Sequence, residues 1–172
     1  SHIGALAASK LTGALPAISG ANLTGFTDAQ MPAGSVLQVV QVTSNSNTDP
    51  NTSWTAIQGA SVVITPSSSS SKILISFNVG GMTNGTPDNI SLKMLRGSTS
   101  IRVSSRYAYA TGSGWFPVPL FFTYLDSPST TSSTEYTIQT KTDTDNDYRI
   151  NNDQSNNGGV NGLVIIAMEI AG

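Results

Sequence analysis

Apolar and polar residues alternate along short stretches of this chain, and turn-forming residues separate the stretches. Ile73–Val79 and Ile90–Met94 each place apolar side chains at every second position. A period of two predicts β-strands with one buried face. Two other stretches, Val36–Val42 and Leu163–Ile170, are apolar at successive positions, which predicts strands that are covered on both faces.

Further strand patterns fill most of the chain after residue 35. They are expected at Trp54–Thr65, Phe116–Leu125, Glu135–Thr140 and Tyr148–Ile150. About eight or nine strands, with turns at intervals of roughly 8–15 residues and no long helical pattern, predict an all-β head. We expect an antiparallel β-sandwich of the jelly-roll kind over residues 35–172.

Glycine and proline mark the expected irregularities of these strands. Gly59 predicts a bulge, and Gly80-Gly81 is expected to end its strand. Arg96-Gly97-Ser98 predicts a hairpin turn. Pro117 and Pro119 place the start of their strand at the edge of a sheet, because proline cannot donate a ladder hydrogen bond.

The first 34 residues have a different texture, small and repetitive. Leu-Thr-Gly occurs at 11–13 and again at 23–25, and Pro16 and Gly20 interrupt any helix between the copies. The few apolar residues cannot bury one another within one chain, so the segment is either a flexible Gly/Ala linker or a fibrous shaft ordered by neighbouring copies. We expect a shaft over residues 1–34, in contact between chains through Leu11, Leu15, Ile18 and Leu23.

Composition excludes several classes of function. Charged residues are 10% of the chain, against about 25% in ordinary domains, and 25 Ser, 20 Thr and 13 Asn take their place. The net charge is −2 without a basic block, which argues against nucleic acid as a partner. Cysteine is absent and no apolar run is long enough for a membrane span. Ser1-His2, with the one histidine, resembles an affinity-tag remnant.

Acidic residues offer candidates for metal binding. Asp143, Asp145 and Asp147 place hard oxygen ligands at alternating positions, as calcium loops do, but the glycine and the downstream acid of an EF-hand are missing. A solvated turn is the alternative, and we expect neither a metal nor another cofactor.

Catalysis would need paired carboxylates, as in a glycan-cleaving enzyme. Asp126, Glu135 and Glu169 are the acids nearest strands. Asp126 is expected to cap its own Asp-Ser-Pro turn, and Glu169, in an apolar strand, to need a partner such as Lys or Arg of a neighbouring chain. We therefore expect no enzyme, with a glycan hydrolase as the less favoured alternative.

Aromatic residues near loops are the candidates for binding. Trp54, Tyr107, Tyr109 and Trp115, with the neighbouring Arg106, could stack on sugars or anchor a protein contact. The alternative for each aromatic is a place in the core.

Five stretches of the sequence resemble bacteriophage tail fibres. LPAISGANLTG (15–25) is similar to the repeat ahead of the fibre tip. ITPSSSSSKILI (64–75), LRGSTSI (95–101), YLDSPSTTSSTEYTIQ (124–139) and AMEIAG (167–172) resemble, in the same order, the tip domain of fibres from environmental phages. The resemblance implies a homotrimeric jelly-roll tip, shaped like the heads of tumour-necrosis-factor-like proteins, without catalytic residues.

The expected function follows from shaft and tip together: attachment of a virion to the host surface, through a glycan or another outer-surface receptor. The chain would belong to the phage tail, folded in the bacterial cytoplasm and joined to the rest of the fibre through its N-terminus, without membrane insertion. The alternative is a purely structural particle protein, such as a capsid decoration or baseplate component.

The two strands that are apolar on both faces predict where the subunits meet. We expect Val36–Val42 and Leu163–Ile170 to be neighbours in one sheet, because a strand with two apolar faces needs a second cover beyond the sandwich. One alternating set of side chains should face the core and the other a neighbouring subunit. The expected contacts are Val36, Val40, Ile165, Ile166 and Met168.

Overall fold

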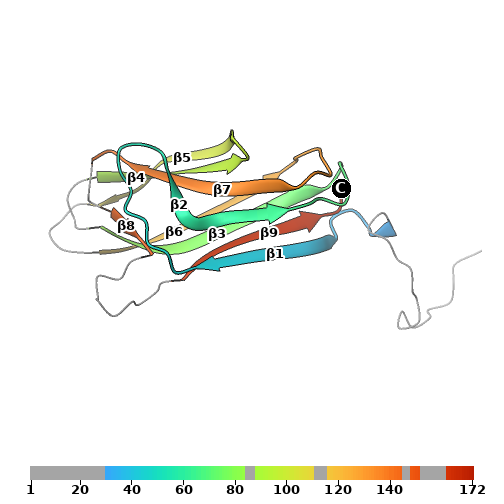
Figure 1. The fold of residues 1–172 in the computed structure, drawn as a ribbon, viewed down its shortest axis with the longest axis horizontal. Helices are drawn as coiled ribbons and strands as arrows, with labels where there is room; N and C mark the ends of the chain where they lie inside the picture. The colour runs from blue at the N-terminus through green and yellow to red at the C-terminus, as the bar shows by residue number, and fades with distance from the viewer. Residues whose placement is uncertain (1–29, 84–87, 111–115, 145–147, 152–161) are drawn as a thin grey trace, which may run out of the picture.

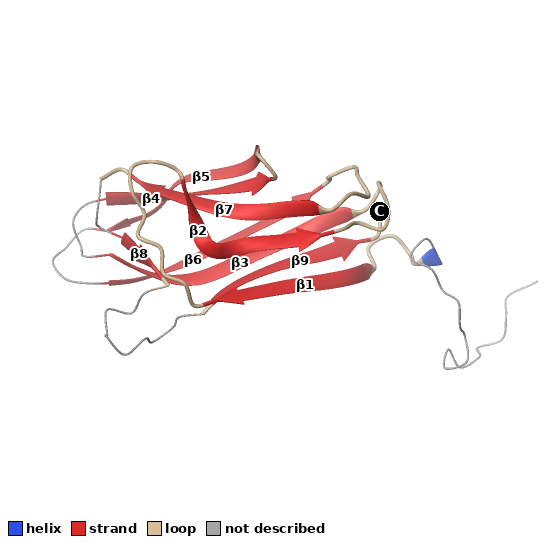
Figure 2. Ribbon diagram, viewed as in Figure 1, coloured by secondary structure: helices blue, strands red, loops and turns tan. Residues whose placement is uncertain are grey.

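The computed structural model describes residues 30–83, 88–110, 116–144, 148–151 and 162–172; the side chains of 82, 83, 88, 106–110, 116 and 117 lie outside that description. These residues form nine β-strands (Figure 1, Figure 2). The strands are β1 (Val36–Ser44), β2 (Thr55–Ile64), β3 (Lys72–Thr83), β4 (Asp88–Arg96), β5 (Thr99–Ala110), β6 (Phe116–Asp126), β7 (Thr134–Thr142), β8 (Tyr148–Ile150) and β9 (Leu163–Ile170).

The strands form two antiparallel sheets that pack as a sandwich, which confirms the predicted fold class. One sheet has the order β1-β9-β3-β6, with β8 also paired to β3, and the other the order β2-β7-β4-β5. The chain crosses between sheets at most connections, and β4–β5 is a hairpin within one sheet. This alternation favours a jelly roll, whose connectivity stays a prediction.

The core lies between the sheets and follows the alternation seen in the sequence. Ile73, Ile75, Phe77 and Val79 of β3 are at most 1% exposed. Their counterparts on the facing sheet, at alternate positions of β4 and β7, are buried as well. Alternating strands pack their apolar faces together because a strand turns successive side chains to opposite sides.

Irregular positions agree with the sequence in three of four cases, among them the hairpin turn at Gly97-Ser98 between Arg96 of β4 and Thr99 of β5. The register of β2 against β7 shifts between Ala56 and Ser61, and Gly59 there has a φ of +78°, so the predicted bulge is present. The proline-containing β6 is an edge strand, also as predicted. The expectation that Gly80-Gly81 ends its strand is wrong, since β3 continues to Thr83 and pairs there with β8.

The predicted neighbours β1 and β9 pair antiparallel, from Val36 opposite Ile170 to Ser44 opposite Leu163. The head begins beside its own C-terminus: Gly34 N donates to Ala171 O (2.7 Å), and Ala171 N donates to Ser35 O (2.8 Å). The end of β5 and the start of β6 lie at the opposite, distal end of the head (Figure 1). Residues 1–29 of the predicted shaft lie outside the described residues, so the division at residue 34 stays a prediction.

Candidate functional site

The outer face of the β1-β9-β3-β6 sheet carries many apolar side chains, among polar ones at Gln41, Thr43, Lys72, Ser76, Asn78 and Thr123. Met168 of β9 pairs with Val39 on one side and with Leu74 on the other, and Leu74 pairs in turn with Leu125 of β6. These four residues therefore form a row across the whole sheet. We call this surface the apolar face; it comprises Val36, Val39, Leu74, Phe121, Leu125, Val164, Ile166, Met168 and Ile170.

Several members of the apolar face are exposed in the single chain. Phe121 is 63% exposed, Val39 56%, Val36 52% and Leu125 48%, while the outward residues of β9 are half-buried. Large exposed apolar residues gathered on one sheet face are typical of a surface that contacts another molecule. Four of the seven large apolar residues exposed in the described part of the chain lie here.

The structure separates the predicted interface residues into two groups. Val36, Ile166 and Met168 lie on the apolar face. Ile165 is fully buried in the sandwich core and Val40 packs against that core, so these two lie behind the face. The predicted alternation along β9 is present; contact with another subunit stays a prediction. Leu11, Leu15, Ile18 and Leu23 lie outside the described residues.

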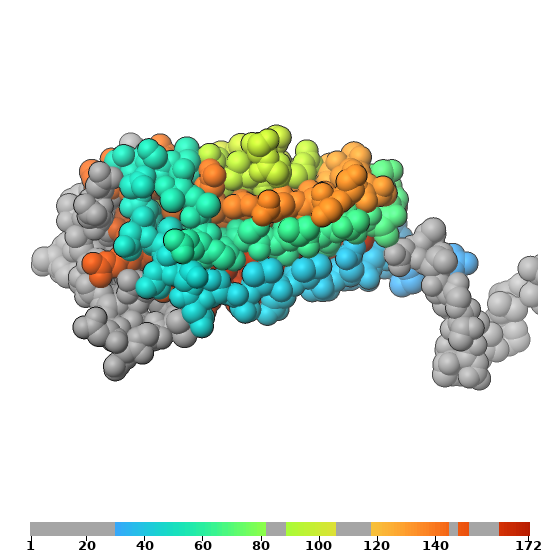
Figure 3. Space-filling model, in the orientation of Figure 1, coloured from blue at the N-terminus to red at the C-terminus, as the bar shows by residue number. Residues whose placement is uncertain are grey.

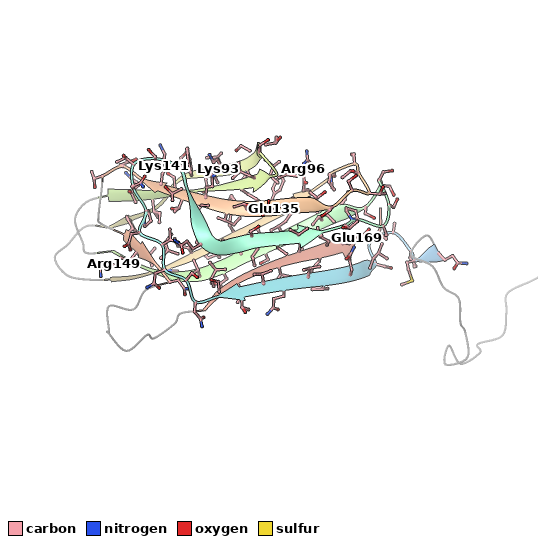
Figure 4. The ribbon with its side chains drawn as sticks, viewed as in Figure 1. Lys93, Arg96, Glu135, Lys141, Arg149 and Glu169 are labelled. Carbon is pink, nitrogen blue, oxygen red and sulfur yellow. The ribbon has the colours of Figure 1, made fainter. Side chains whose placement is uncertain are left out.

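The outer face of the other sheet is mainly polar. Glu135, Thr137, Gln139 and Lys141 alternate along β7 with inward side chains, and Lys93 follows the same pattern on β4. Figure 4 shows the labelled Glu135, Lys141 and Lys93 along this sheet, and Figure 3 shows β7 at its surface between β2 and the β4–β5 hairpin. Val63, Leu95 and Val103 are its apolar members. The two outer faces thus differ in chemistry.

Trp54 lies next to this polar face, at the start of β2. Thr55 pairs with Thr140, which places Trp54 beside Lys141, and Lys93 reaches the same ring from β4. The centroid of the half-buried Trp54 ring lies 4.4 Å from Lys93 Nζ and 5.5 Å from Lys141 Nζ. Both distances are within the range of cation–π attraction. The sequence singled out Trp54 as a candidate and missed both lysines.

The other predicted binding residues cannot be placed side by side. Arg106, Tyr107 and Tyr109 belong to β5, but their side chains are not among those described, and Trp115 lies outside the described residues. Their part in binding stays a prediction.

Asp126 is hydrogen-bonded to residues distant from it in sequence. Its carboxylate is 6% exposed and accepts hydrogen bonds from Arg96 Nη1 (2.9 and 3.1 Å) and from the hydroxyl of the buried Tyr136 (2.7 Å). Burial and the hydrogen bond to Asp126 raise the pKa of Tyr136. Since Arg96 and Tyr136 are opposite each other in one sheet and Asp126 ends β6 of the other, the carboxylate ties the two sheets together. The cap that Asp126 was expected to form on its own turn stays a prediction.

Glu169 is fully buried and finds its partners within its own chain. Gln38 Nε2 donates to one carboxylate oxygen (2.6 Å), and the backbone N and the hydroxyl of Ser67 donate to the other (2.7 Å each). Burial, the largest single influence, raises the pKa of Glu169. The hydrogen bonds from Gln38 and from the serine loop (Ser67–Ser71, between β2 and β3) together hold that pKa below its ordinary value of 4.5. The expectation of a Lys or Arg partner from a neighbouring chain is therefore wrong.

Metal binding receives no support from the acids whose positions are described. No group of three or more metal-ligating side chains gathers there, and Asp143 accepts a hydrogen bond from Asn89 Nδ2 (2.7 Å). Asp145 and Asp147 lie outside the described residues. The described part of the chain also contains no helix long and apolar enough to cross a membrane.

Comparisons with known proteins give a loose likeness in fold. No protein-family model and no curated protein sequence matches the chain. Similar solved structures include infectious bursal disease virus, Gx strain (12% identity, 90% of this chain, 42% of that chain, TM-score 0.45). A mutant VP2 protein of that virus in derived particles (11%, 91% and 41%, TM-score 0.41) and the disulfide-linked pili of Bacillus endospore appendages (13%, 88% and 99%, TM-score 0.36) are similar too.

The chain spans about two fifths of the length of these viral proteins (42% and 41%). Likeness at these scores and identities assigns no function. The resemblance of the sequence to phage tail fibre tips accordingly stays a prediction.

Proposed function

We propose that this chain is the receptor-binding tip of a phage tail fibre, a homotrimer that attaches the virion to the host cell surface without catalysis. The observation that carries the proposal is the contrast between the two outer sheet faces. One carries an apolar row across all four strands and four exposed large apolar residues, which suits contact between copies of the chain. The other is mainly polar, which suits contact with solvent and a receptor.

Association through the apolar face has a clear energetic basis. Full burial of a Val, Leu, Ile or Phe side chain stabilises by about 1.5–3 kcal/mol. Four residues of the apolar face are each about half exposed: Val36, Val39, Phe121 and Leu125. Burying the exposed part of each in a subunit contact would therefore stabilise the assembly by roughly 1 kcal/mol per residue. Symmetry counts every such residue three times in a trimer.

The direction of the head fits a tip at the end of a shaft. Gly34 and Ser35 are hydrogen-bonded to Ala171, so β1 begins at the end of the head where β9 ends (Figure 1). The end of β5, the strand that contains Tyr107 and Tyr109, and the start of β6 lie at the far end (Figure 1). Residues at that end would meet the host first.

A binding role without catalysis agrees with how the acids are used. Asp126 and Glu169 hold the fold together through the hydrogen bonds described above, and Glu135 accepts a hydrogen bond from the Ser61 hydroxyl (2.5 Å). A shallow pocket near the C-terminus is lined by Met31, Leu37, four serines of the β2–β3 loop, Ala171 and Gly172. The Ser67 hydroxyl of this pocket donates to Glu169, whose carboxylate also accepts from Gln38 and from the Ser67 backbone, an arrangement that favours a structural role over general-base catalysis.

Cell binding tests the proposal against its structural alternative. The labelled protein is mixed with a panel of bacterial strains, and purified surface polysaccharide from any strain that binds is used as the competitor. We expect binding to particular strains, competition by their polysaccharide, and no released oligosaccharide. A folded protein that binds none of the strains would favour a decoration or baseplate component, and released oligosaccharide would favour a hydrolase.

A further inference from the structure

We infer that Trp54, Lys93 and Lys141 form a binding site for an acidic saccharide on the outer face of the β2-β7-β4-β5 sheet. The inference rests on the proposed receptor-binding function, for which it names the chemical class of the receptor. Three strands that are far apart in sequence bring an aromatic ring and two cations together there.

Neither ammonium group has an acidic partner among the described residues. The one salt bridge in that part of the chain joins Arg96 to Asp126, and Glu135, an acid on the same face, accepts its hydrogen bond from Ser61. The two ammonium groups are close to one ring centroid, so they lie within roughly 10 Å of each other, a range over which charges still interact at physiological salt. An anion between them would be attracted by both.

The ring and the cations together select the ligand. Aromatic rings contact the apolar C–H faces of sugars, while a carboxylate, sulphate or phosphate group makes strong hydrogen bonds with ammonium groups. Lysine carries its charge on a flexible stem, so both ammonium groups can move onto an anion beside the ring. Gln139 is outward and half-buried on β7, opposite Lys93 and two residues before Lys141. Its amide offers a donor and an acceptor for sugar hydroxyls.

A nucleic acid also combines rings with negative charge, but the observations favour a saccharide. Phosphate backbones are bound by tracts of basic residues, and this chain has a net charge of −2 with eight Lys and Arg residues in total. The candidate site contributes two lysines and no basic tract. It also lies on the sheet opposite the apolar face, so it stays accessible when copies associate through that face.

Tryptophan fluorescence tests the site directly. The chain has two tryptophans, so Trp115→Phe leaves Trp54 as the reporter. We titrate this protein with uronic acid, sialic acid and sulphated oligosaccharides, each paired with a neutral counterpart, and with a DNA oligonucleotide. We expect a saturable change with acidic sugars alone, weakened about tenfold or more by Lys93→Ala with Lys141→Ala. Lys72→Ala, which removes a charge from the other sheet, should leave it unchanged.

Three results would overturn the inference: an equal response to neutral sugars, unchanged binding after both lysines are replaced, or no response to any acidic sugar. A stronger response to DNA would overturn it in favour of nucleic acid. A cell-binding assay distinguishes an error in this site from an error in the proposed receptor-binding function. If the lysine double variant binds cells as the parent does, the site is wrong and the receptor-binding role stands; if the parent binds no cells, that role is wrong.

Discussion

The hydroxyl of Tyr136 should stabilise the head measurably, because it meets a carboxylate inside the sandwich. Tyr136 is fully buried and its hydroxyl lies 2.7 Å from the nearly buried Asp126 carboxylate. A hydrogen bond to a charged acceptor contributes about 1.5–3 kcal/mol. Tyr136→Phe leaves Asp126 its bonds with Arg96, so we expect a loss of about 2 kcal/mol in unfolding free energy, or roughly 4–8 °C in melting temperature.

Tyr124→Phe is the matched control. Tyr124 is a half-buried residue of β6 that packs against the same core, and its hydroxyl has no hydrogen-bond partner among the described residues, so removing it should change stability by about 0.5 kcal/mol or less. Urea and thermal unfolding are compared at one protein concentration, because assembly makes stability depend on concentration. Equal losses in the two variants would refute the stabilising role of the Tyr136–Asp126 contact.

Three further predictions test other parts of the structure. Ile166→Asp should break the assembly and leave each chain folded, whereas Ile165→Asp in the core should unfold it; light scattering and circular dichroism separate the two, and an intact Ile166→Asp trimer would contradict the interface. The Glu169 carboxylate has a lowered pKa in the folded state, so its stabilisation is present above the unfolded value and lost as pH falls from about 5 towards 3. In the Glu169→Gln variant the free energy of unfolding should vary less with pH over that range. A variant with the same pH dependence as the parent protein would argue against this role of Glu169. Gly59→Ala should destabilise by about 1–3 kcal/mol, because the new Cβ would meet Ser44 at a φ of +78°; an unchanged melting temperature would contradict this.

Side-chain alternation made the sandwich predictable, and a glycine pair misled the prediction of one strand end. The inward set of β3 is buried as its period of two predicts. Gly80-Gly81 was interpreted as a strand end, but at Gly81 a Cβ would come 3.1 Å from the Val118 carbonyl oxygen of β6. Glycine in a strand can mark close approach of another backbone, and sequence alone does not separate this case from a turn.

Partners of the buried acids could not be predicted because they are distant in sequence. Glu169 lies on the same inward side of β9 as Leu163 and Ile165, so the alternating pattern of the sequence was sufficient to predict its burial. Its donors Gln38 and Ser67 come from elements more than a hundred residues earlier. The register of β1 against β9 brings Gln38 next to Glu169, and the fold of the serine loop brings Ser67 to it. Neither follows from the sequence pattern.

One of the three residues of the candidate saccharide site could be predicted from the sequence, and the other two could not. Trp54 stood out as an aromatic residue beside a loop, but nothing near it in sequence indicates a charge. Lys93 and Lys141 become its neighbours only through the order β2-β7-β4. A register of this kind is fixed by side-chain packing between strands, which one-dimensional patterns do not contain.

The mass of the protein in solution tests the central claim, association of three heads through the apolar face, most directly. Size-exclusion chromatography with light scattering should give three times the chain mass of 17.9 kDa at micromolar concentration. The value should fall to one chain mass in the Ile166→Asp variant without loss of β-structure. A mass of one chain for the unmodified protein would contradict the claim.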